Sequence, residues 1–152
     1  MRCDAIMTVN PPSVRDTDSI ATAAKKLVGE RHLGLPVVDT DGRYVGMFGA
    51  DDLLGLVVPR IAIAGGNVVP NLRFVSDNPN TLAERFREIA QQNVGSIADR
   101  NAITLAPDTP QIEAFRIFCR SRAPLPVVDP KSRKLVGLVS YFDVMGAVTA
   151  NA

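Results

Sequence analysis

Tryptophan is absent from the 152-residue chain, and aromatic residues make up only 5% of it. Because 46% of the residues are hydrophobic, the core must be built from aliphatic side chains rather than from rings. Metal-binding residues are scarce too: the only histidine is His32, and Cys3 and Cys119 form neither a CxxC motif nor a metal-ligand spacing. This scarcity argues against a zinc site. Free thiols and the lack of a signal peptide predict a reducing, cytoplasmic location.

An excess of charge of one sign is also lacking. The chain has 17 basic and 16 acidic residues, a formal net charge of +1, which gives no field for steering toward nucleic acid or an anionic membrane. Basic residues are dispersed and aromatic residues scarce, so no platform for stacking bases is expected. The most apolar stretch, residues 53–75, is broken by prolines, glycines and charged residues and will not span a bilayer. We expect no nucleic-acid partner and no membrane span.

Catalytic motifs are missing as well. The chain contains no GxSxG motif, no Cys–His pair and no Walker loop, and residues 65–67 (Gly-Gly-Asn) lack the lysine of a phosphate-binding loop. Asp51 and Asp52 are adjacent carboxylates. Neighbours at the start of a helix point about 100° apart, however, so they do not converge on one proton or ion. The sequence therefore predicts a protein that is not an enzyme and has no metal site.

An internal repeat is the most informative feature that the chain does contain. Residues 35–39, Leu-Pro-Val-Val-Asp, return at residues 125–129, an offset of 90. In both copies a turn and a Val-Gly pair follow, and an aspartate, Asp52 or Asp143, comes six residues after that glycine. A repeat with a long period indicates one supersecondary unit made twice and stacked over a shared core. Any site built by one unit therefore has a counterpart in the other.

Hydrophobic periodicity and turn residues predict the order β-α-β-β-α in both units. In the first unit a helix begins at Asp16, Asp18 or Ser19, runs to about residue 31 and is stopped by Gly34. Its other elements are an extended segment at 9–14, a strand at 35–39, a turn at 41–42, a strand at 43–48 and a helix from about 51 to 58. The second unit has a strand at 103–105, a helix after 107–110, strands at 125–129 and 134–139, and a closing helix at 142–148. The predicted fold class is α/β.

A connector, residues 59–95, separates the two units. Thr81 and Glu84 have the spacing of a capping box, and Leu82, Phe86 and Ile89 share one face, which predicts a helix over about 82–92. Residues 60–80 are apolar and rich in turn residues, and the sequence assigns them no structure. A packed connector, a lid and a contact for a partner protein all remain open for them.

The repeated Leu-Pro-Val-Val-Asp, the hairpin, the Val-Gly pair and the closing aspartate resemble the CBS domain, the module named after cystathionine β-synthase. The resemblance covers both units, residues 1–58 and 96–152. It implies two CBS motifs that pack sheet-to-sheet as a pseudo-two-fold pair, and a homodimer of such pairs.

The resemblance also implies a regulatory function. CBS pairs typically bind adenosine-containing ligands (AMP, ADP, ATP or S-adenosylmethionine) in clefts between the two motifs and control an attached or partner protein. Here the regulated protein would be a separate polypeptide that the sequence does not identify. No cofactor would be required, because the adenine nucleotide or S-adenosylmethionine would act as the regulatory ligand. The alternative is a ligand-free CBS pair that serves as a dimerisation and protein-docking module.

The family's ligand motif, Gly-hydrophobic-x-Ser/Thr-x-x-Asp, distinguishes the two units. The aspartate accepts hydrogen bonds from the ribose hydroxyls, and the Ser/Thr hydroxyl and the following helix N-terminus face phosphate. Residues 137–143 match the motif fully, with Ser140 and Asp143, whereas residues 46–52 keep Asp52 but carry Gly49 in place of the hydroxyl. An aspartate or serine at these positions also serves as an ordinary helix cap. The resemblance thus implies two clefts, of which the one with Ser140 and Asp143 is preferred.

Main-chain groups beside the first strand and before the Leu-Pro pair usually read the adenine edge in this family, and Val37 and Val127 would form walls of the adenine pocket. The corresponding positions are Ser13, Val14, Ile103, Thr104, Gly34, Leu35, Pro124 and Leu125. AMP-sensing members often have a basic residue directly before Leu-Pro, where this chain has Gly34 and Pro124. His32 and Arg122 lie two residues further upstream, and we expect them to be solvated. The resemblance therefore favours a lightly charged adenosine ligand over a triphosphate.

Overall fold

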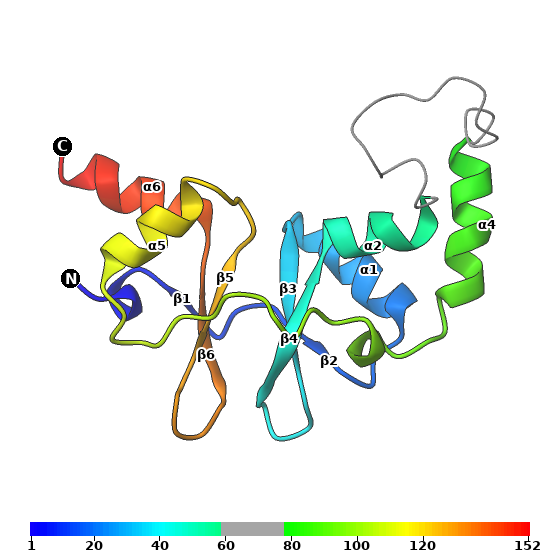
Figure 1. Ribbon diagram of the computed structural model, residues 1–152, viewed down its shortest axis with the longest axis horizontal. Coiled ribbons are helices and arrows are strands. Elements are labelled where there is room, and N and C mark those ends of the chain that lie inside the picture. Colours follow the sequence, from blue (N-terminus) through cyan, green and yellow to red (C-terminus); the bar gives the residue numbers. More distant parts are fainter. Residues whose placement is uncertain (59–77) are drawn as a thin grey trace.

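The computed structural model describes residues 1–58 and 78–152. They form two three-stranded sheets that face each other at the centre of the molecule, with helices on the outer flanks (Figure 1). The two β-hairpins lie side by side. The Tyr44 N–H donates to the Arg133 carbonyl over 2.9 Å, and the Leu135 N–H donates to the Gly42 carbonyl over 3.1 Å. The predicted α/β fold with a sheet-to-sheet pair is confirmed.

The first sheet has the strand order β2-β3-β4. Its motif consists of β2 (Val14–Arg15), α1 (Ile20–Glu30), β3 (Gly34–Val38), β4 (Tyr44–Gly49) and α2 (Ala50–Val57). The Ser19 side chain caps α1 by accepting a hydrogen bond from the Thr22 N–H. Ser19 is one of the three residues at which the sequence predicts that this helix begins. The helix ends at Arg31, whose φ of 53° is left-handed. The expectation that Gly34 stops it was therefore wrong, because Gly34 already belongs to β3.

The second sheet has the order β1-β6-β5. Its elements are β1 (Thr8–Val9), α5 (Gln111–Phe118), β5 (Leu125–Val128), β6 (Leu135–Val139) and α6 (Tyr141–Ala150). The strand expected at 103–105 shrinks to one parallel bridge between Leu105 and Val127. Aliphatic residues dominate both cores, as the composition predicts. The fully buried side chains include Val14, Ile20, Leu35, Val37, Phe48, Val94, Val127 and Val139.

The segments that precede the two motifs are exchanged between the sheets. Residues 1–9, which the sequence places in the first unit, pair with the second: β1 lies antiparallel to β6, and the Cys3 N–H donates to the Thr109 carbonyl. Residues 94–99 complete the first sheet, where Asp99 bridges Met47. Both crossing segments are visible in Figure 1. In each motif, the segment that precedes it in the sequence therefore packs on the sheet of the other motif.

The exchange explains the repeated Val-Gly pair. A Cβ on Gly46 would stand 2.7 Å from the Asp99 carbonyl oxygen, and a Cβ on Gly137 would collide with the Met7 side chain. Real Cβ atoms essentially never come this close to main-chain oxygen. Glycine is needed at position 46 because the backbone of Asp99 crosses there, whereas at position 137 the crossing segment approaches through the Met7 side chain.

The connector helix is α4 (Pro79–Ile89), which packs against α2. Its cap is Asn78, whose Oδ1 accepts from the Asn80 N–H (2.9 Å) and the Thr81 N–H (3.2 Å). The predicted capping box at Thr81 was wrong, because Asn78 followed by Pro79 starts the helix earlier. The open interpretations of residues 60–80 fall largely outside the described residues.

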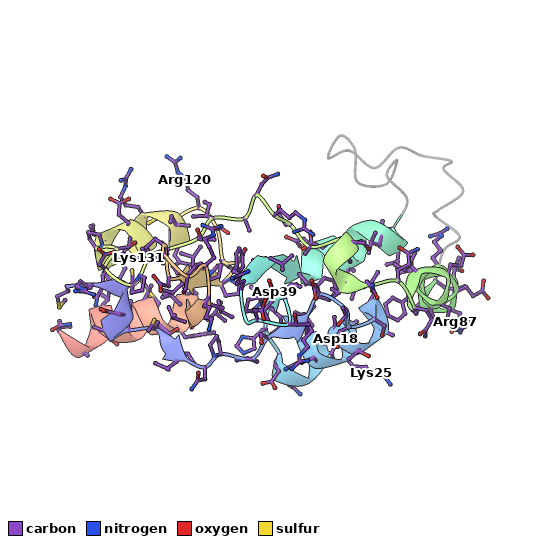
Figure 2. The ribbon with its side chains drawn as sticks, turned by 90° about the horizontal axis from the view of Figure 1, so that it is seen from below. Asp18, Lys25, Asp39, Arg87, Arg120 and Lys131 are labelled. Atoms are coloured by element: carbon purple, nitrogen blue, oxygen red, sulfur yellow. The ribbon has the colours of Figure 1, made fainter. Side chains whose placement is uncertain are left out.

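Charged side chains project from both motifs (Figure 2); Asp18 and Lys25 are labelled on the first, and Arg120 and Lys131 on the second. Both cysteines are free, Cys3 buried and Cys119 exposed. No helix within residues 1–58 and 78–152 is long and apolar enough to cross a membrane.

Candidate functional site

The N-terminus of α6 is organised by Ser140 and Asp143. The Asp143 carboxylate accepts through Oδ2 from the Ser140 N–H (2.7 Å) and from the Ser140 hydroxyl (2.8 Å). In return, the Asp143 N–H donates to Ser140 Oγ (3.2 Å). This reciprocal arrangement is a capping box. It leaves Asp143 Oδ1 with no hydrogen bond from the described part of the chain.

The N-terminus of α2 has the same geometry without the hydroxyl. Asp52 Oδ2 accepts from the Gly49 N–H over 2.7 Å. Burial raises the pKa of Asp52 above its ordinary value of 3.8, the Gly49 N–H opposes this shift, and the negative charges of Asp99 and Asp51 add to it. Gly49 has no side chain to cap the helix, so the Asp52 N–H has no side-chain acceptor there.

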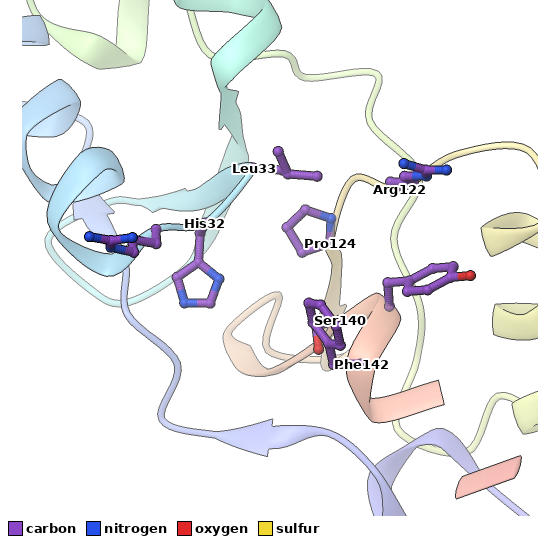
Figure 3. Close-up of a pocket in the computed structure, with 8 residues that line it drawn as sticks. His32, Leu33, Arg122, Pro124, Ser140 and Phe142 are labelled. Atoms are coloured by element: carbon purple, nitrogen blue, oxygen red, sulfur yellow. The ribbon is translucent and has the colours of Figure 1, made fainter. Parts of the chain in front are cut away.

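A cleft of about 510 Å³ opens at the N-terminus of α6, and we call it the Ser140 cleft. Figure 3 shows that His32 of the first motif faces Ser140 and Phe142 of the second across this space. Its walls are Arg31, His32, Leu33, Arg122, Pro124, Ser140, Tyr141 and Phe142. Both His32 and Arg122 line the cleft; His32 is half-buried, and Arg122 is exposed, in line with the expectation that it is solvated. The left-handed conformation of Arg31 turns the chain from α1 toward it.

A second cleft of about 370 Å³, the Asp52 cleft, lies at the N-terminus of α2. It joins Asp51, Asp52 and Asp99 with the loop that precedes β5. The predicted site residues among its walls are Gly34, Asp52, Ile103, Pro124 and Leu125. Each cleft thus combines the helix N-terminus of one motif with the helix–strand loop of the other.

The two repeated units match the protein-family model of the CBS domain at residues 3–59 and 94–150. The chain belongs to the CBS domain family. A CBS domain-containing protein of Dictyostelium discoideum is 27% identical over 145 residues, which cover 93% of this chain and 83% of that protein. The CBS-pair protein CBSX2 of Arabidopsis thaliana superposes with a TM-score of 0.77 at 23% identity, covering 98% of this chain and 94% of CBSX2. A structure of CBSX2 in complex with AMP matches with a TM-score of 0.70 at 24% identity, covering 98% and 96%.

Four residues that the CBS resemblance places at the adenine pocket have buried side chains. Val37 and Val127 are 0% exposed, so the structure gives neither side chain a surface toward a ligand. Val14 and Leu35 are buried in the same way. These residues can shape the CBS clefts only through their backbones or through the packing behind the walls.

Two further expected residues reach neither cleft wall through their side chains. Thr104 is exposed and lies outside the residues that line the clefts. Ser13 is half-buried, and its carbonyl accepts a hydrogen bond from Lys26 Nζ over 2.6 Å. A ligand could use that carbonyl only beside the lysine or in its place.

Sequence reasoning missed the cleft residues Arg31, Leu33, Tyr141 and Phe142. The last two stand at the x positions of the CBS ligand motif, where the family pattern asks for no particular side chain. Arg31 and Leu33 flank His32 at the end of α1 and meet Ser140 only because the two motifs face each other. The available signal was the pair of basic residues, Arg31 and His32, just before the first Leu-Pro pair.

Proposed function

We propose that this CBS pair is a non-catalytic regulatory module that binds an adenosine ligand bearing a phosphate, of the AMP type, in the Ser140 cleft and controls a partner protein. The observation that carries the proposal is the convergence of Arg31, His32 and Arg122 on the cleft at the N-terminus of α6. Guanidinium groups recognise phosphate through paired N–H donors. The N-terminus of a helix adds main-chain donors and a favourable dipole.

The ribose would reach past Ser140 to Asp143, which is bonded to that residue but does not itself line the Ser140 cleft. Asp143 Oδ2 already accepts from Ser140, and its Oδ1 is available to the two ribose hydroxyls. An ionised carboxylate can only accept, so it selects a ligand group that donates. Ser140 would hold this carboxylate in place, because its hydroxyl proton points to Asp143.

The phosphate would lie against the first turn of α6. Within the described residues the N–H groups of Tyr141 and Phe142 make no hydrogen bond, and three basic side chains surround the same space. A likeness at the level of the fold to CBSX2, which was crystallised in complex with AMP, supports a nucleotide of this kind.

Regulation would follow from the composition of the cleft. A ligand there touches Arg31 and His32 of one motif and Ser140 of the other, so it favours whichever arrangement of the pair brings these groups together. Its effect is limited by the difference in its affinity for the two arrangements. A partner protein would bind one of the two arrangements in preference to the other.

We further propose that the protein acts as a cytoplasmic homodimer. Phe142, Met145 and Val148 of α6 are 83%, 40% and 48% exposed, and no charged residue follows Asp143 in the chain. Apolar helix faces of this kind are typical of protein interfaces. Native mass spectrometry of the purified protein gives its oligomeric state and any retained nucleotide together.

Titration calorimetry with AMP, ADP, ATP and S-adenosylmethionine tests the ligand proposal. We expect AMP to bind, and Asp143→Asn to weaken it by about a hundredfold, because two hydrogen bonds to a charged group contribute about 1.5 kcal/mol or more each. Asn preserves the shape of the cap, and Asp41→Asn, in the exposed hairpin turn, is the control. If the wild-type protein binds none of the four compounds, the proposal fails and the ligand-free docking module takes its place.

A further inference from the structure

The two clefts occupy equivalent places in the repeat but differ in the residues at their helix N-termini. With the offset of 91 that relates Gly46 to Gly137, the first-turn residue Asp51 of α2 corresponds to Phe142 of α6. Both residues line their own cleft. The neighbouring positions are Gly49 opposite Ser140, Ala50 opposite Tyr141 and Asp52 opposite Asp143.

Charge separates the clefts most clearly. Among the described residues, the walls of the Ser140 cleft carry three basic side chains, and the carboxylate beside them is that of Asp143, which is bonded to Ser140. The walls of the Asp52 cleft carry the carboxylates of Asp51, Asp52 and Asp99, with no basic side chain from the part of the chain that the structure describes. A phosphate that entered the second cleft would meet charge of its own sign, which disfavours binding. The effect of Asp99 and Asp51 on the pKa of Asp52 shows that these carboxylates interact.

The main-chain donors differ in the same direction. The Ala50 N–H, the first of α2, already donates to the Leu33 carbonyl over 2.9 Å. The equivalent Tyr141 N–H of α6 has no such partner among the described residues. The helix with the acidic surroundings therefore also offers an anion one donor fewer.

Arg122 is a cation that two of the hollows share. It lines the Ser140 cleft and also a hollow of about 330 Å³ beside Asp51, where Arg120 is the other basic residue. Arg120 projects away from the body of the molecule (Figure 2). One guanidinium cannot hold a phosphate in both places. Asp51 and Arg122 both line the hollow, whereas the residue of α6 that corresponds to Asp51 is the uncharged Phe142 of the Ser140 cleft.

We infer that Asp51 is a specificity-determining residue that closes the Asp52 cleft to phosphate-bearing ligands, so that each chain binds one such ligand, in the Ser140 cleft. The inference rests on the proposed function. The Asp52 cleft keeps its ribose acceptor, and it is the charge at its entrance that rejects the nucleotide. Replacing Asp51 by its uncharged isostere makes the two clefts more alike and admits a second ligand.

Equilibrium dialysis with labelled AMP counts the ligands directly. We expect about one AMP per chain for the wild-type protein and about two for Asp51→Asn, with the affinity of the Asp52 cleft raised about tenfold by the loss of one charge at a solvent-exposed position. The matched control, Asp41→Asn, removes the same charge outside both clefts and should bind one AMP. The double variant Asp51→Asn/Asp143→Asn should keep about one AMP at tight affinity, which assigns the new site to the Asp52 cleft.

The outcomes separate the two proposals. Two AMP molecules on the wild-type chain, or one on Asp51→Asn with an unchanged thermal transition, would overturn the role of Asp51 and leave the proposed function standing. If the double variant binds no AMP at tight affinity, the role of Asp51 is likewise overturned and the proposed function stands. No AMP on the wild-type chain would overturn the proposed function and this inference with it.

Discussion

Gly46 lies where the exchanged segment crosses the first sheet, and its replacement by alanine tests that arrangement. The Met47 N–H donates to the Asp99 carbonyl over 3.0 Å, and the Asp99 N–H donates to the Met47 carbonyl over 2.7 Å. An added Cβ would stand 2.7 Å from the Asp99 carbonyl oxygen and 3.0 Å from its carbon. Both obstacles are main-chain atoms, so no rotamer change can relieve the contact.

The expected cost follows from the parts of this contact. Overpacking a close contact costs about 1–3 kcal/mol, and loosening two main-chain hydrogen bonds adds about 1 kcal/mol each. The lower entropy of an unfolded chain with alanine returns about 0.4–1 kcal/mol. We therefore expect Gly46→Ala to lower the free energy of unfolding by about 2–4.5 kcal/mol, a large share of the roughly 5–15 kcal/mol of a typical domain.

Urea unfolding of three matched variants measures this cost. In Gly137→Ala the obstacle is the flexible Met7 side chain, which can move, so the loss should be about 1 kcal/mol. In Gly55→Ala nothing lies within 4 Å of the new Cβ, and alanine in α2 should stabilise the protein by about 0.5–1 kcal/mol. Equal effects at Gly46 and Gly55 would refute the crossing of residues 94–99 over β4.

Three smaller perturbations test the cap, the interface and the acidic cleft. Ser140→Ala removes the cap of α6 and should cost about 1–2 kcal/mol of unfolding free energy in urea, and an unchanged value would contradict the capping box. Tyr44→Phe removes a hydroxyl that is buried without a partner among the described residues, so the free energy of unfolding should stay level or rise by about 1 kcal/mol. A loss of more than about 1 kcal/mol would show that the hydroxyl is bonded. Because its folded-state pKa is raised above 3.8, ionised Asp52 costs stability above that pH and not below it. Asp52→Asn should therefore unfold at a higher temperature than wild type at pH 7, with the difference vanishing in acid, whereas a difference that grew in acid would reverse the sign of the shift.

The fold follows from the sequence because its signals are local and occur twice. The Leu-Pro-Val-Val-Asp strands, the hairpin turn at Gly42 and the cap at Ser19 each act within a few residues, and the structure has all three. The predicted start of α4 was wrong because two candidate cap residues lie close together in the sequence. Thr81 has the spacing of a cap, but Asn78 satisfies the same orphan N–H groups from a better position.

The exchange of N-terminal segments was beyond local reasoning. Residues 8–9 pair with β6 across most of the chain, and nothing in their own sequence distinguishes that partner from β4. The repeated glycines lie where the other segments cross the sheets, but the sequence does not say which segment crosses at each glycine.

The candidate site was predicted in its chemistry but only partly in its composition. Ser140, Asp143 and Asp52 lie at helix N-termini as the motif implies. Part of the wall that faces Ser140 comes from the opposite motif, as His32 shows, whereas Arg122 belongs to the same motif as Ser140. The charge difference between the clefts likewise appears only when Asp99 is placed beside Asp51 and Asp52.

Chemical-shift mapping of the backbone amides during an AMP titration tests the central claim most directly. The account predicts that the N–H signals of Tyr141 and Phe142 move, because the phosphate binds at the first turn of α6. Those of Ala50 and Asp51, at the equivalent turn of α2, should stay in place. Shifts at Ala50 and Asp51 alone, or no shifts at saturating AMP, would contradict a nucleotide site in the Ser140 cleft.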